Sequence, residues 1–240
     1  MGSTKKGIGS SAVSKTARYS ASPDAEKKIK RIISVFKKIN PSPTTELRYR
    51  NPYELVVATL LSAQCTDKRV NEITPEFFKR FPDVYALAKA SPKEVYELIK
   101  TCSYPNNKTK YLIELAQKVV NEFGGEIPDN AKDLQKLPGI GKKSAHVIAS
   151  TLYGEPVLGV DTHVFRVTKR LGLHNARSPE QTERILSPLI PPEYRSKFHH
   201  WIILHGRYVC KARKPECNKC PLIDICDYYV NKQVSGKDGS

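Results

Sequence analysis

The sequence Asp133-Leu-Gln-Lys-Leu-Pro-Gly-Ile-Gly-Lys-Lys-Ser-Ala-His-Val-Ile-Ala-Ser150 contains two helical patterns joined by a tight turn. Leu134 and Leu137 are spaced three apart, as one face of a short helix requires. After the turn, apolar residues recur at helical spacing from Ala145 to Leu152. Pro138 lies between the two patterns and fixes the turn. The segment therefore predicts two helices packed against each other across a hairpin.

The hairpin is a candidate phosphate site. Gly139 and Gly141 allow backbone angles and a close approach that a side chain would forbid. The second helix then begins with free N–H groups, which attract an anion together with the helix dipole, Lys142 and Lys143. Many such turns only pack two helices, so the local pattern leaves both interpretations open.

The charge of the chain favours a polyanionic partner. Its 240 residues include 40 Lys and Arg against 24 Asp and Glu, a formal net charge of +16. Such an excess suits nucleic acid more often than a membrane surface. No apolar run approaches the length of a membrane span, and no segment pairs a lysine face with an aromatic one. We expect one or two compact domains and no membrane association.

The periodicity is helical from Ser22 onward, and no alternating run predicts a strand, so we expect an all-α protein. Helix starts with the spacing of a capping box occur at Asn51, Ser91 and Ser178, and a Ser-Pro-Asp start at 22–24. The predicted helices after the first are 53–63, 67–80 with an interruption near Pro75, 83–90, 92–102, 107–123, 131–137, 142–153, 161–171, 179–188 and 194–210. Residues 1–22, rich in Ser, Gly and Lys without an acidic residue, and residues 231–240 are expected to be disordered.

Four of the six cysteines fall in one short segment with the spacing C-x6-C-x2-C-x5-C, as Cys210, Cys217, Cys220 and Cys226. No secretory signal is present, so we expect an intracellular, reducing location, where such a cluster binds metal. Four thiolates suit zinc or a [4Fe–4S] cluster, and spacing does not distinguish them. Lys211 and Arg213 make this loop basic, which suits contact with phosphate. Cys65 and Cys102 are solitary in the sequence.

Lys143 and Asp161 are the candidates for chemistry. A lysine in the first turn of a helix has its positive charge disfavoured by the dipole, and a neutral amine can form a Schiff base. Most lysines of a basic protein only neutralise phosphate. Asp161, in Val160-Asp-Thr-His163, lies where a helix should start and is expected to cap it. A cap is rigid, so it can also present a carboxylate to a site, while His163 is expected to be structural.

Three motifs together resemble the endonuclease III family of bifunctional DNA glycosylases and abasic-site lyases. They are Leu-Pro-Gly-Ile-Gly-Lys-Lys at 137–143, Val-Asp-Thr-His at 160–163, and His-Gly-Arg-Tyr-Val-Cys at 205–210 leading into the cysteine loop. The resemblance covers roughly residues 23–230. It implies base-excision repair of oxidised pyrimidines in damaged double-stranded DNA.

The resemblance also implies the roles of single residues. Lys143, rather than Lys142, would displace the damaged base at C1′ and form the imine. Asp161 would assist by stabilising positive charge and by taking part in proton transfer. β-Elimination would then cut the strand on the 3′ side. The four clustered cysteines would hold a [4Fe–4S] cluster in place of zinc.

DNA contacts follow from the same resemblance. Family members flip the target nucleotide and fill the gap; Gln64, in Leu-Ser-Ala-Gln-Cys-Thr-Asp at 61–67, matches the filling glutamine. Tyr104 falls where a wedge residue is expected, but Ser-Tyr-Pro at 103–105 replaces the commoner Gly-Leu-Tyr, which leaves the opposite-base preference open. The remaining expected DNA contacts are in the hairpin and the cysteine loop: Leu137, Gly139, Gly141, Lys142, Lys211 and Arg213.

The implied fold has two helical domains with the active cleft between them. A six-helix barrel with the hairpin would span 45–155, and residues 23–44 and 156–230 would form the second domain with the cluster loop. A monomer in the cytoplasm or nucleoid is expected by analogy.

Three other functions fit parts of the sequence. The first is a monofunctional glycosylase of the same superfamily, such as the adenine-mismatch type, which carries Ser or Tyr at the position of Lys143. A non-catalytic helix–hairpin–helix DNA-binding protein needs neither Asp161 at this spacing nor Gln64. An iron–sulfur electron-transfer protein would leave the basic excess and the hairpin unexplained. All three explain less of the sequence than the bifunctional enzyme does.

Overall fold

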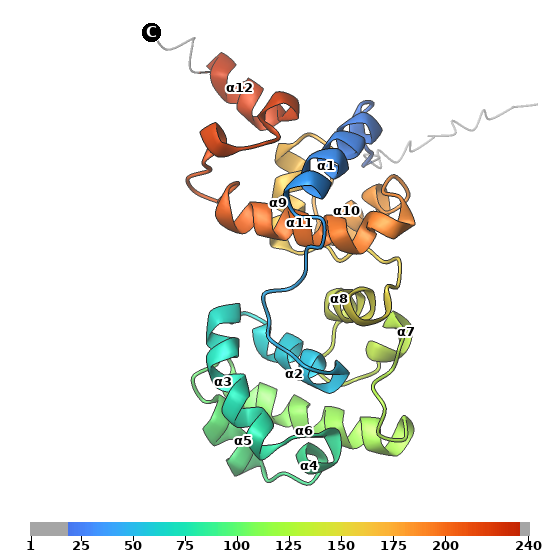
Figure 1. Ribbon diagram of the computed structural model, residues 1–240, viewed down its shortest axis with the longest axis vertical. Coiled ribbons are helices and arrows are strands. Elements are labelled where there is room, and N and C mark those ends of the chain that lie inside the picture. Colours follow the sequence, from blue (N-terminus) through green and yellow to red (C-terminus); the bar gives the residue numbers. More distant parts are fainter. Residues whose placement is uncertain (1–18, 236–240) are drawn as a thin grey trace, which may run out of the picture.

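The computed structural model describes residues 19–235, and the expected all-α fold is confirmed over that range (Figure 1). The helices are α1 (Ala25–Ile39), α2 (Pro52–Ser62), α3 (Asp67–Arg80), α4 (Val84–Ala88), α5 (Pro92–Ile99), α6 (Pro105–Glu122), α7 (Ala131–Leu134), α8 (Lys142–Tyr153), α9 (Thr162–Arg170), α10 (Pro179–Leu186), α11 (Arg195–Tyr208) and α12 (Asp227–Ser235). Short 3-10 turns lie at Pro192–Tyr194, Cys217–Lys219 and Ile223–Ile225.

Two hydrophobic clusters organise these helices. The first joins α2–α8 around α2, whose residues Tyr53–Leu61 are all buried, as expected for a helix that is apolar on every side. The second joins α1 with α9–α11 and the start of α12. Figure 1 shows the two groups one above the other, linked by the segments before α2 and after α8. Helix α8 packs on α2 and α7 and also contacts α11, so its first turn lies where the groups meet.

The N-terminal boundary differs from the prediction. Helix α1 begins at Ala25 rather than after a Ser22 cap, and the Ser22 hydroxyl instead donates to the Asp24 carboxylate at 2.9 Å. Residues 19–22, expected to be disordered, are ordered because their main chain pairs with 173–175. In this pairing Ala21 bridges His174, and the N–H of Ser22 donates to the Leu173 carbonyl at 3.1 Å. Residues 1–18 lie outside the described range.

Two further expectations are corrected. Residues 231–235, also expected to be disordered, continue α12, while 236–240 lie outside the described range. Helix α3 runs through Pro75 without a break. The Pro75 ring faces solvent, and the neighbouring Ile73 and Phe77 are buried, so packing holds the helix although one N–H is lost.

The helix starts agree with the sequence in part. Ser91 forms a complete capping box with Glu94. At Asn51 and Ser178 the capping side chain accepts from the expected N–H. The side chains of Glu54 and Gln181 do not accept from the N–H of the cap itself. They accept from the N–H of the residue before it, Arg50 and Arg177 respectively.

Candidate active site

The hairpin before α8 has the tight geometry that its glycines predict. Gly139 has φ +78°, and a Cβ there would lie 2.9 Å from Leu60 Cδ1 and 2.9 Å from Tyr111 Cβ. The turn thus packs directly on α2 and α6 and tolerates only glycine. Gly141 is the N-cap of α8 and has no side chain to accept from the first N–H groups. The start of α8 is therefore open to an anion.

Leu137 anchors the hairpin. Its side chain is 2% exposed and lies in the first hydrophobic cluster. Its carbonyl accepts from the N–H of Ile140 at 3.1 Å, which closes the turn. Contact of this residue with DNA stays a prediction.

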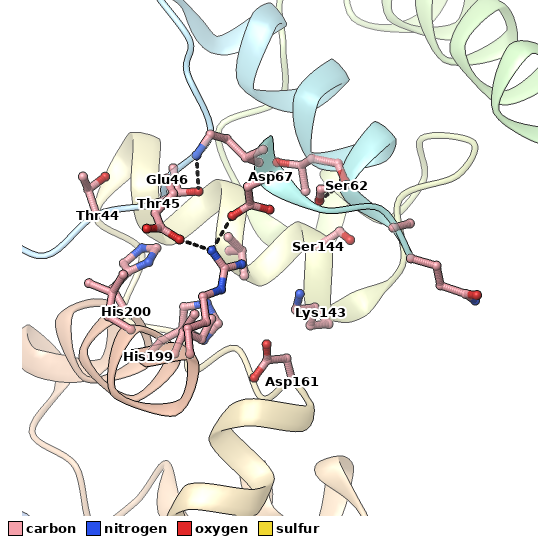
Figure 2. A pocket seen from close by; sticks show the side chains of 18 residues that line it. Thr44, Thr45, Glu46, Ser62, Asp67, Lys143, Ser144, Asp161, His199 and His200 are labelled. Carbon is pink, nitrogen blue, oxygen red and sulfur yellow. Dashed lines mark hydrogen bonds and ion pairs between the residues drawn. The ribbon is translucent and has the colours of Figure 1, made fainter. Parts of the chain in front are cut away.

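Lys143 and Asp161 line one pocket of about 230 Å³ between the two helical groups (Figure 2). Lys143 lies in the first turn of α8 and is exposed to solvent, and Asp161 is the N-cap of α9. The structure therefore brings together the lysine and the carboxylate that the sequence selected.

Asp161 is held rigidly. Its Oδ1 accepts from the N–H of Val164 at 2.8 Å, and its Oδ2 lies 3.3 Å from His163 Nδ1. Burial raises the pKa of the Asp161 carboxyl, but the hydrogen bond from His163, the positive charge of His199 when it is protonated, the N–H of Val164 and the charge of Lys143 together outweigh burial. The net pKa lies well below the ordinary aspartate value, so the carboxylate stays ionised at neutral pH.

Two histidines of α11 form the inner wall of the pocket. His199 is 1% exposed, and its Nδ1 lies 2.7 Å from the Gly159 carbonyl oxygen. Burial lowers the pKa of His199 to about 4 and that of His200 to about 3. Both rings are neutral at physiological pH, so the cations that line this pocket are Lys143 and Arg207, and Arg207 is paired with Glu46 and Asp67.

An ion-pair network that the sequence did not indicate closes the far side of the pocket. Arg207 Nη1 pairs with Asp67 Oδ2 at 2.6 Å and with the carboxylate of Glu46, to which the Tyr208 hydroxyl also donates. Glu46 and Asp67 both point toward this side of the pocket in Figure 2. Arg207 comes from α11 and Asp67 from the first turn of α3, so the network ties the two helical groups together. Arg207 is 140 positions from Asp67 and 161 positions from Glu46 in the sequence, so no local pattern connects them.

Gln64 and Tyr104 share an unusual backbone. Each has φ +54°, and within residues 19–235 they are the only non-glycine residues with positive φ. This conformation costs about 1–2 kcal/mol for a residue with a side chain. Gln64 lines the pocket, and Tyr104 is 60% exposed at the start of α6. Strain at exposed side chains next to a pocket is typical of functional positions.

The remaining basic candidates have local partners or lie in solvent. Lys142 Nζ forms an ion pair with Glu183 of α10 at 2.9 Å. Lys211 pairs with Glu216 within the cysteine loop, and Arg213 is exposed.

The four clustered cysteines line one cavity of about 20 Å³. None of the four forms a disulfide, and Arg170 Nη1 lies 3.4 Å from Cys210 Sγ. Burial raises the pKa of the Cys220 thiol to about 11. Among residues 19–235, no group of three or more His, Cys, Asp or Glu side chains is arranged to hold a single metal ion.

No helix within residues 19–235 combines the length and apolar character of a membrane crossing.

Comparison with known proteins agrees with this site. Residues 57–192 match the model of the HhH-GPD superfamily base excision DNA repair proteins. Endonuclease III of Rickettsia felis is 42% identical over 207 residues, covering 86% of this chain and 97% of that protein. Endonuclease III of Escherichia coli is 39% identical over 197 residues, covering 82% and 93%.

Solved structures give the same answer. A non-covalent endonuclease III–DNA complex and a trapped endonuclease III–DNA covalent intermediate each match with a TM-score of 0.82 and 36% identity, covering 87% of this chain and 98% of that chain. The chain belongs to the HhH-GPD superfamily of base excision DNA repair proteins and, within it, to the endonuclease III family.

Proposed function

We propose that Lys143 and Asp161 carry out the glycosylase and AP lyase reaction of this bifunctional base-excision repair enzyme. The observation that carries the proposal is their shared pocket: an exposed lysine at an uncapped helix start faces an ionised carboxylate that caps the next helix.

The reaction begins when the unprotonated amine of Lys143 attacks C1′ of the damaged nucleotide and the base leaves with the glycosidic electron pair. Asp161, with its low pKa, is a weak proton acceptor, so its main contribution is to stabilise the positive charge that develops on the sugar. Loss of a proton from nitrogen and opening of the sugar ring give the imine. The imine acidifies the 2′ position; removal of that proton expels the 3′ phosphate and cuts the strand.

Damaged double-stranded DNA is the partner that fits this surface. The open start of α8 suits a backbone phosphate, and Gly139 and Gly141 keep side chains out of its way. Lys142, Lys211 and Arg213 would add positive charge, the first two after giving up their present carboxylate partners. We assign filling of the flipped-out gap to Gln64 and the wedge to Tyr104. Oxidised pyrimidines are the proposed lesions.

The cysteine loop suits a [4Fe–4S] cluster. Its four thiols line one cavity, which fits a cofactor held by four cysteines, and the family resemblance favours the [4Fe–4S] cluster over zinc. Cys210, Cys217, Cys220 and Cys226 would be its ligands, and the Arg170 guanidinium would donate to Cys210 Sγ. When bound, the cluster would supply four bonds that hold this loop and its basic residues in place.

The two hydrophobic clusters support a division into a barrel domain at 45–155 and a second domain formed by 23–44 and 156–230. We propose that the protein acts as a monomer inside the cell.

Borohydride trapping on a duplex with one abasic site tests the assignment. Wild type should form a covalent adduct, Lys143→Ala should form none, and Lys142→Ala, which removes the neighbouring charge, should still form it. An adduct that persists in Lys143→Ala would move the nucleophile elsewhere. No adduct from folded wild type would refute the lyase activity.

A further inference from the structure

The turns that carry Gln64 and Tyr104 are joined although they lie far apart in the sequence. The Ser103 hydroxyl donates to the Gln64 carbonyl at 2.6 Å, across 39 positions of the chain. Both turns hold their exposed residue at φ +54°. The link places two strained residues next to each other on adjoining turns.

Lys108 lies beneath both turns. It belongs to the first turns of α6 and is 4% exposed. Its ammonium donates to the carbonyls of Leu61 at 2.7 Å and Ala63 at 2.8 Å, directly before Gln64. Its own main-chain N–H donates to the Tyr104 carbonyl at 3.1 Å. One residue therefore bonds to the chain beside each strained position.

The positive charge of Lys108 interacts with main-chain carbonyl groups. Burial lowers its pKa, and the hydrogen bonds to carbonyls at the end of α2, where the helix dipole is negative, favour the charged form. The neighbouring thiols of Cys65 and Cys102, which are solitary in the sequence, lie 3.9 Å apart. Burial raises the pKa of Cys102 to about 11, so it stays a neutral thiol at physiological pH and provides no anion for the ammonium.

We propose that Lys108 is a positioning residue for DNA insertion, which fixes the turns of Gln64 and Tyr104 to each other so that both side chains enter the duplex as one preassembled unit. The proposal rests on the proposed function, because it requires that these two residues insert beside a flipped nucleotide. Preassembly removes the ordering of two separate turns from the binding step, so it should strengthen binding to a site that needs insertion. Undamaged duplex, bound without insertion, should gain nothing.

Lys108→Met tests this, because methionine keeps most of the length and removes the charge and its donors. Lys110→Met is the matched control: Lys110 lies on the same helix, loses the same charge, and is exposed with only a surface ion pair to Glu114. Each protein is titrated with a duplex carrying a tetrahydrofuran abasic-site analogue and with the undamaged duplex. Single-turnover cleavage of a true abasic site at saturating protein measures the chemistry.

Lys108→Met should bind the abasic analogue about tenfold more weakly, since two charge-assisted hydrogen bonds are lost, while undamaged duplex and the saturating cleavage rate change little. Lys110→Met should affect both duplexes equally. An unchanged preference for the analogue in Lys108→Met, or an equal loss on both duplexes, would overturn the proposal.

If Lys108→Met does not fold, a second variant tests the proposal. Ser103→Ala removes the other link at a partly exposed site. A several-fold loss of preference for the analogue supports the joined turns, and an unchanged preference overturns them. Trapping by wild type is measured separately, so failure of the proposed function is distinguishable from failure of this inference.

Discussion

Helices α8 and α9 both begin at the same pocket, but the N–H groups of their first turns are capped differently. The start of α8 has Gly141 as its cap and no side-chain acceptor for its first N–H groups. The start of α9 is satisfied internally by Asp161, whose carboxylate accepts from the N–H of Val164. An open start suits a phosphate that arrives with the substrate, whereas a closed start holds a carboxylate still for chemistry. In this pocket, the uncapped start of α8 would therefore bind the phosphate, and the capped start of α9 would hold the catalytic carboxylate.

The largest effect should come from Asp161→Asn. Asparagine still caps the helix, but it lacks the charge that the surroundings of Asp161 favour, so stability at pH 7 should fall by about 1–3 kcal/mol. The charge that stabilises the transition state is lost, and single-turnover base removal should slow by about 10²–10³-fold. A normal rate in this variant would mean that Asp161 is only a cap.

The next largest effect should follow from Gly139→Ala, which disturbs the hairpin before the open start. The substitution combines positive φ with a Cβ 2.9 Å from Leu60 and Tyr111, and should cost about 2–4 kcal/mol in thermal unfolding. Gly154→Ala is the control, since its φ is +68° but nothing lies within 4 Å of the added Cβ. If both variants lose the same stability, the close approach of the turn contributes nothing.

Acid pH should reduce the stabilisation that the ionised Asp161 provides at the start of α9. The folded pKa of Asp161 is below its unfolded value, so its contribution to stability is present above about pH 4 and is lost as pH falls through the folded pKa. The stability difference between wild type and Asp161→Asn should therefore shrink in acid by about 1 kcal/mol or more. Chemical denaturation at pH 3 and pH 7 measures it, and a pH-independent difference would contradict the assigned cause.

Gly141→Ser would close the open start. Serine at this extended N-cap can accept from the α8 N–H groups, and nothing lies within 4 Å to clash with its Cβ. Stability should rise by a few tenths of a kcal/mol, while affinity for duplex DNA should fall about two- to fivefold because the phosphate must displace the hydroxyl. Tighter DNA binding by this variant would show that the open start does not receive a phosphate.

The smallest effect should come from Glu183→Gln, which releases Lys142 beside the open start. The ion pair is partly exposed, so DNA affinity should increase by no more than about threefold and stability should hardly change. A titration at low and high salt measures it. A decrease in affinity would indicate that the pair positions Lys142 for DNA rather than occupying it.

The sequence predicts the parts of this site that lie close together in the chain. Apolar periodicity defines the helices, Pro138 and the glycines define the hairpin, and Asp161 is recognisable as a cap. The buried role of Leu137, the link from Lys108 to the Gln64 turn, and the ion pairs of Arg207 depend on contacts between distant segments. No local pattern encodes such contacts, because each residue taken alone is an ordinary leucine, lysine or arginine of an amphipathic helix.

The proposed reaction requires that Lys143, and not Lys142, reacts at the sugar. Tandem mass spectrometry of the borohydride-trapped wild-type complex, after digestion of protein and DNA, identifies the modified lysine without any mutation. The sugar remnant should be found on Lys143, and Lys142 should be unmodified. A remnant on Lys142, or on a lysine outside the pocket, would contradict the proposed reaction.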